Sequence, residues 1–124
     1  MSRMELINEM NKYFTKNGIE RIAEALYWDV RWDEDNIAGE KCVEFSKYSP
    51  AGEDFSFEVW YSHVSEIPEK VMEYYEEFDA EEHVMIWAEH AGRNGVPRLR
   101  ELLEDADAIE DMIRELAIAL KEEN

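Results

Sequence analysis

The stretch Asp54-Phe-Ser-Phe-Glu-Val-Trp-Tyr61 carries the clearest secondary-structure signal of the 124-residue chain. Its apolar residues fall at every second position, which predicts a β-strand with one buried face. Cys42 to Tyr48 predicts a second strand. Between them, Ser49-Pro-Ala-Gly52 is typical of a turn, because proline presets φ and glycine tolerates positive φ. The two strands should therefore form a hairpin over about residues 42–61.

Two helices and a third strand are expected before the hairpin. Residues 4–16 carry apolar side chains at helical spacing, and Asn17-Gly18 is a pair that commonly ends a helix. A second helix should begin at Ile19. Residues 27–33 alternate in polarity, which favours a strand, and a helix that continues to about Trp28 is the alternative.

Three helices are expected after the hairpin. The first covers about residues 65–78. Asp79 has the character of an N-cap, and Glu82 three residues later completes a capping-box pattern at the start of the second helix. Pro97 suits the first turn of the third helix, where its missing N–H is tolerated.

The last helix is the most regular of the expected elements. Its apolar residues alternate spacings of three and four along one seam: Leu99, Leu102, Ala106, Ile109, Ile113, Leu116 and Leu120. Leu103, Met112 and Ala117 widen this seam, as in a helix packed into a core, and self-association through the seam is the alternative. Ile118 lies opposite and should be exposed. Together these elements predict a single α+β domain over residues 1–124.

Composition excludes several classes of protein. The chain has 31 Asp and Glu against 13 Lys and Arg, a formal net charge of −18. Direct binding of nucleic acid or of an anionic membrane surface needs the opposite charge. No apolar run reaches the roughly 18–20 residues of a membrane span, and residues 1–11 lack the apolar region of a signal peptide. We therefore expect a cytoplasmic protein.

No catalytic, cofactor or metal motif stands out. The acidic segment 33–36 fails as an EF-hand loop, because its fifth and sixth positions are apolar where an oxygen ligand and glycine are needed. His83 and His90 share a helical face but lie about 10 Å apart, too far for one metal ion. Cys42 is expected to be a packed side chain, not a reactive thiol. We expect no enzyme, metal or cofactor, and keep a small enzyme that uses clustered carboxylates with a divalent metal as an alternative.

The acidic residues are concentrated in the C-terminal half. Residues 1–64 carry 13 acids and 7 bases, a net charge of −6, whereas residues 65–124 carry 18 acids and 6 bases, a net charge of −12. One group lies at the junction of the first two C-terminal helices: Glu73, Glu76, Glu77, Asp79, Glu81 and Glu82. A second group forms a stripe of about 21 Å on the outer face of the last helix: Glu101, Glu104, Asp107, Asp111 and Glu115.

Two interpretations of this acidic surface compete. It can serve solubility alone, in an accessory interaction module that associates with a partner or with itself through an apolar face. It can also imitate nucleic-acid phosphates, because duplex DNA carries a charge about every 1.7 Å, so that 18 charges match roughly 30 Å of duplex. A surface of the second kind would bind the basic channel of a nuclease or methylase.

Three blocks of the sequence resemble a known group of proteins. Ser49–Val59, Glu77–Val84 with Trp87, and Gly95-Val-Pro97 leading into Glu101–Ala106 resemble small acidic proteins encoded by phages and mobile elements of gut Firmicutes. The resemblance covers about residues 20–120. That group is largely uncharacterised, so it implies no catalytic residues.

The genomic setting of that group implies anti-restriction or anti-CRISPR work inside a bacterial host. We therefore expect a non-enzymatic inhibitor of a basic nucleic-acid-binding protein, such as a nuclease or CRISPR effector. The eleven acidic residues named above would be its binding surface.

Overall fold

The computed structural model describes residues 15–34, 40–90 and 99–122. These residues form an α+β fold with a three-stranded antiparallel sheet. Its elements are, in order, α2 (Lys16–Ala25), β1 (Asp29–Asp33), β2 (Lys41–Tyr48), β3 (Asp54–Tyr61), a short 3-10 helix η1 (Val64–Glu66), α3 (Ile67–Glu77), α4 (Ala80–His90) and α5 (Leu99–Glu122). The α+β class is confirmed. The expected five helices are not, since the described residues contain four α-helices, one before the sheet and three after it.

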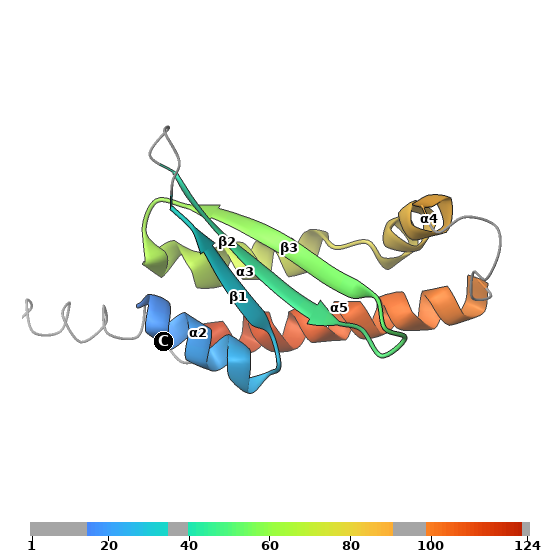
Figure 1. The fold of residues 1–124 in the computed structure, drawn as a ribbon, viewed down its shortest axis with the longest axis horizontal. Helices are drawn as coiled ribbons and strands as arrows, with labels where there is room; N and C mark the ends of the chain where they lie inside the picture. Colours follow the sequence, from blue (N-terminus) through green and yellow to red (C-terminus); the bar gives the residue numbers. More distant parts are fainter. Residues whose placement is uncertain (1–14, 35–39, 91–98, 123–124) are drawn as a thin grey trace, which may run out of the picture.

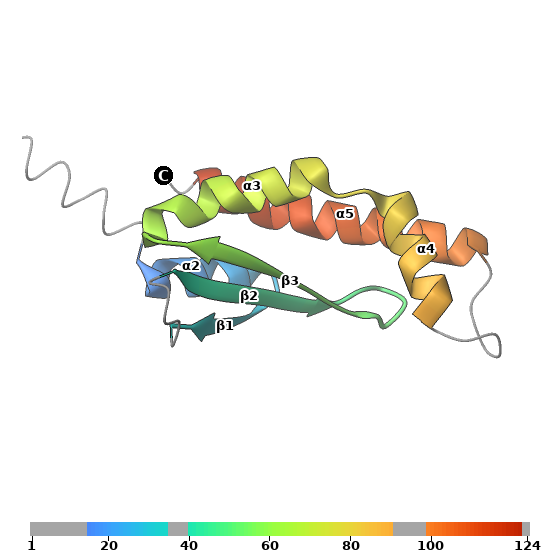
Figure 2. The ribbon, with the colours of Figure 1, turned by 90° about the horizontal axis from the view of Figure 1, so that it is seen from above.

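The sheet and the helices form two layers, seen in Figures 1 and 2. The long helix α5 runs behind the sheet, with α3 and α2 beside it. Helix α4 lies at the far end, near the turn that joins β2 to β3 and near the start of α5. This end of the molecule has a small core of its own, formed by Val84, Leu102 and Ala106.

The strand order is β1-β2-β3, and the register pairs Val43 with Val59 and Phe45 with Phe57. These four side chains are buried against the helices. In β3 every second side chain is buried, so the predicted hairpin and its inward face are both confirmed. The turn also has the expected chemistry, with Gly52 at φ +92°.

The start of α2 differs from the prediction. Asn17-Gly18 was expected to end a helix, but both residues lie in the first turn of α2, which runs from Lys16 to Ala25. Thr15 caps this helix, because its Oγ1 accepts the Gly18 N–H at 3.1 Å. The Gly18 N–H, which has no intrahelical partner in this first turn, is thereby satisfied. The expected helix over residues 4–16 lies almost entirely outside the described residues.

The end of α2 settles the choice at residues 27–33 in favour of a strand. The N–H of Tyr27 bonds the carbonyl of Glu24, and the N–H of Trp28 bonds that of Ala23. This pair of bonds is the Schellman arrangement that closes a helix. It places Tyr27 at φ +68°, and β1 begins at Asp29. A helix that continues to Trp28 is therefore wrong.

The predicted seam of α5 is buried from Leu102 onward. Leu102, Ala106, Ile109, Ile113, Leu116 and Leu120 are all at most 4% exposed. Met112 and Ala117 are buried beside them, whereas Leu103 is 37% exposed because it lies about 90° round the helix from the seam centre. Ile118 is exposed, as predicted. Because the described part of the seam packs within the chain's own core, it offers no free face for self-association.

Candidate functional site

Ten of the eleven predicted acidic residues have described side chains, and all ten are exposed. Six lie on α3, on α4 and at their junction, and four lie on α5. The side chain of Glu101 lies outside the description. These ten residues are called the helical acidic surface below.

The acids at the junction of α3 and α4 differ in their relation to the helix ends. Asp79 caps α4, since its Oδ1 accepts the N–H groups of Glu81 at 3.0 Å and of Glu82 at 3.3 Å. Negative charge is favourable there because a helix N-terminus carries partial positive charge. Glu76 and Glu77, by contrast, occupy the last turn of α3, where the helix dipole opposes negative charge. These two charges therefore lie where they lower the stability of the helix.

The α5 part of the surface lies opposite the buried seam. Asp107 and Glu115 are exposed there, as is Asp111. Asp111 pairs with the guanidinium of Arg114 at 3.1 Å, so the stripe is not uniformly negative. In the part of the chain that the structure describes, no ion pair involves Glu73, Glu76 or Glu77.

A second acidic surface, on the outer face of the sheet, was missed by the sequence analysis. The strand register places five carboxylates and one guanidinium on this face: Asp29, Asp33, Glu44, Asp54, Glu58 and Arg31. Glu44 and Glu58 lie directly opposite each other, a repulsive pair. Arg31 relieves it by contacting Glu44 at 3.1 Å. The alternation of the strands is a sequence signal for this face, because the positions between the buried residues carry these charges.

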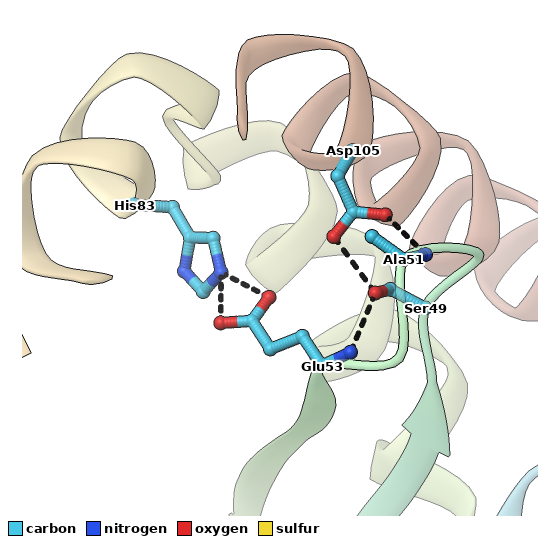
Figure 3. Close-up of polar contacts among 5 residues, drawn as sticks. All are labelled: Ser49, Ala51, Glu53, His83 and Asp105. Atoms are coloured by element: carbon cyan, nitrogen blue, oxygen red, sulfur yellow. Dashed lines mark hydrogen bonds and ion pairs between the residues drawn. The ribbon is translucent and has the colours of Figure 1, made fainter. Parts of the chain in front are cut away.

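Polar contacts fix the tip of the hairpin to α4 and α5 (Figure 3). The Ser49 hydroxyl donates to Asp105 Oδ2 at 2.7 Å, and the Ala51 N–H donates to Asp105 Oδ1 at 2.9 Å. The Glu53 N–H in turn donates to Ser49 Oγ at 3.0 Å. Glu53 also holds His83 of α4, with its two carboxylate oxygens 2.9 and 3.1 Å from Nε2. Asp105 is buried and thus structural, in contrast to its neighbours Glu104 and Asp107 on the surface.

A pocket of about 270 Å³ opens where α3 meets α4. It is lined by Tyr74, Glu77, Phe78, Asp79, Glu82, His83 and Ile86. Its aromatic walls are continuous with the core, because Tyr74 stacks on Phe57 with ring centroids 4.3 Å apart. Burial raises the pKa of the Tyr74 hydroxyl, which stays neutral at physiological pH. The pocket thus combines a rigid aromatic wall with a carboxylate rim.

Cys42 is packed, as predicted. It is buried on the outer face of the sheet, between Asp33 and Trp60 in the register. Burial, assisted by the carboxylate of Glu58, raises the pKa of its thiol to about 11. The thiol is therefore protonated, and a poor nucleophile, near neutral pH.

Other chemistry has little structural support in the described residues. Within 15–34, 40–90 and 99–122, no three His, Cys, Asp or Glu side chains are grouped so that they could hold a metal ion. His83 is partly buried and its ring contacts Glu53. Among the described helices, none is long and apolar enough to cross a membrane.

Comparisons of the chain with protein-family models, with curated proteins and with solved structures find no match. The resemblance to small acidic phage and mobile-element proteins therefore stays a prediction.

Proposed function

We propose that the protein is a non-enzymatic inhibitor that binds the basic nucleic-acid channel of a defence protein, such as a nuclease or a CRISPR effector. The observation that carries this proposal is the helical acidic surface, above all the unpaired carboxylates at the end of α3. Glu76 and Glu77 lie in the last turn of α3, at the negative end of the helix dipole, and neither forms an ion pair within the described residues. Charges kept against local stability are characteristic of a binding surface.

The physical basis of the inhibition is the exchange of one polyanion for another. A nucleic-acid channel holds lysine and arginine side chains that normally neutralise phosphates. Exposed carboxylates on rigid helices offer these side chains the same charge without a scissile bond. Long-range attraction would speed association, and dissolved salt would weaken the complex.

A cleavage assay tests this function. The purified protein is added to a panel of restriction endonucleases and an RNA-guided nuclease, with polyglutamate of equal carboxylate concentration as the control for bulk charge. We expect inhibition of at least one nuclease, relieved by excess duplex DNA and weakened as salt rises from about 0.05 M to about 0.3 M. Inhibition of none, or inhibition unchanged over this salt range, would contradict the proposal.

An accessory interaction module is the second candidate, favoured by the apolar side chains exposed on α4. Met85 is 64% exposed, and Ile86, which also lines the pocket, is 49% exposed. Such side chains suit contact with another protein. Light scattering separates a homodimer formed through this patch from a monomer, and the Met85→Lys variant should dissociate a dimer of that kind.

A further inference from the structure

The pocket between α3 and α4 has the size of a site for one side chain. Its volume of about 270 Å³ falls below the range of about 300–1,000 Å³ that is usual for cofactors and drug-sized ligands. Ile86 and the rings of Tyr74 and Phe78 form the apolar part of its lining. Glu77 and Glu82 supply exposed carboxylates at the rim.

Contacts with neighbouring side chains fix the positions of the residues that line the pocket. The Phe78 ring lies 6.0 Å from Phe55 and 5.7 Å from the imidazole of His83, measured between centroids. His83 is itself held by both oxygens of Glu53. The Asp79 carboxylate accepts two backbone N–H groups, so its position is also fixed. A guest would therefore meet a site that is already arranged.

These features match a guanidinium group better than any other common side chain. A guanidinium is planar, stacks on aromatic rings and forms paired hydrogen bonds with carboxylates. An ammonium group can satisfy the carboxylates but lacks the flat face. The methylene stem of an arginine would pack against Ile86.

We propose that this pocket receives a single arginine side chain of the basic partner. The proposal rests on the proposed function, because it names the group by which the partner is anchored. It adds a specific contact to an attraction that is otherwise set by charge alone. The remaining helical acidic surface would then steer and orient the partner around this anchor.

An NMR titration of the full chain tests the pocket without any partner. The probes are Nα-acetyl-arginine amide, the corresponding lysine compound and the corresponding citrulline compound, which keeps the planar shape without the charge. We expect saturable shifts of the backbone amides of Tyr74, Phe78, His83 and Ile86 with the arginine probe. The lysine probe should bind roughly threefold or more weakly, and the citrulline probe should give no saturable shift.

Variants locate the binding. Glu82→Gln should weaken the arginine probe roughly fivefold, while Glu24→Gln, the same exposed charge loss on α2 and outside the helical acidic surface, should leave it unchanged. Phe78→Leu tests the aromatic wall with an apolar side chain retained. If the amide spectrum of Phe78→Leu shows misfolding, Glu77→Gln is measured instead. It tests the carboxylate rim and should also weaken the arginine probe roughly fivefold.

The outcomes separate this inference from the proposed function. Shifts spread over all exposed acids, equal losses in Glu82→Gln and Glu24→Gln, or absence of saturation would overturn the arginine pocket. Inhibition of a nuclease could still be found in that case. Conversely, arginine binding at the pocket with no nuclease inhibited would keep the pocket and remove the proposed target class.

Discussion

Asp105 of α5 accepts a buried hydrogen bond of 2.7 Å from Ser49 of the β2–β3 turn, although the two residues lie 56 positions apart in the sequence. Both side chains are at most 7% exposed. A buried carboxylate is costly unless it is hydrogen-bonded, and the N–H of Ala51 supplies the second bond. This contact therefore ties the hairpin to α5 at the end of the molecule where α4 and the pocket lie.

Removal of the Asp105 carboxylate should destabilise the fold. In Asp105→Ala, the Ser49 hydroxyl and the Ala51 N–H lose their acceptor, and we expect a loss of about 2–4 kcal/mol in the free energy of unfolding. Asp105→Asn should lose less, because one amide oxygen can still accept. Urea unfolding measures both. Asp107→Ala, on the exposed face of the same helix, is the control and should stay within about 0.5 kcal/mol of the wild type. An unchanged unfolding midpoint in Asp105→Ala would contradict the structural role of this contact.

Replacement of Tyr27 by glycine should stabilise the protein. Tyr27 has φ +68° and is 84% exposed, so its Cβ is strained while its ring contributes little packing. Glycine relieves this strain, with a gain of about 1 kcal/mol. Thermal unfolding should show a higher midpoint for Tyr27→Gly than for Tyr27→Ala, which removes the ring and retains the strain. Equal midpoints for the two variants would count against the strained conformation.

Neutralisation of two acidic residues that lie close together in the chain should change the free energy of unfolding in opposite directions. Glu76 lies in the last turn of α3 and Glu81 in the first turn of α4. Glu76→Gln should therefore raise the free energy of unfolding, and Glu81→Gln should lower it, each by about 0.3–1 kcal/mol at low salt. Urea unfolding at low and high ionic strength measures the difference, which should shrink with salt. If both variants changed the free energy of unfolding in the same direction, the claim that the Glu76 charge destabilises α3 would be wrong.

The Cys42 thiol should resist alkylation in the folded protein. With its pKa at about 11 instead of 9.0, about a hundredfold less thiolate is present at pH 8 than in the unfolded chain. The rate of iodoacetamide labelling, in native protein and in urea, measures this. An equal rate in the two states would rule out the raised pKa.

Stability should also fall between pH 9 and 11 because of this thiol. The unfolded thiol loses its proton from about pH 9, whereas the folded one keeps it to about pH 11. The folded state therefore binds more protons in this window, and stability decreases as pH rises. Cys42→Ala should show a shallower decrease, because the contribution of the thiol is then absent.

The parts of the fold that were predicted correctly have strong local periodicity. Burial at every second residue of β3 follows from its alternation, and the seam of α5 follows from its spacing. The N-cap at Asp79 was also predicted, because the capping group and its N–H donors are neighbours in sequence. The positive φ of Tyr27 was not, since nothing in a tyrosine indicates that conformation.

The organisation of the candidate site was less accessible from sequence. Exposure of the helical acids follows from helical spacing opposite an apolar face. The contact of His83 with Glu53 joins α4 to the hairpin over 30 residues, and only the folded chain brings them together. The pocket likewise forms only where α3 and α4 meet in the folded chain. The stop expected at Asn17-Gly18 is also not found, because Thr15 caps a helix whose first turn contains that pair.

Charge reversal on two faces of the molecule is the most direct test of the central claim that the helical acidic surface is the binding face. The double variant Glu76→Lys/Asp107→Lys alters that surface, and Asp29→Lys/Asp54→Lys alters the outer face of the sheet by the same amount of charge. The measurement is the Kd for the nuclease that the wild type inhibits most. We predict that the helical variant weakens binding at least about tenfold, or about 1.4 kcal/mol, and the sheet variant less than about threefold. Equal losses in both variants, or a larger loss in the sheet variant, would contradict the claim.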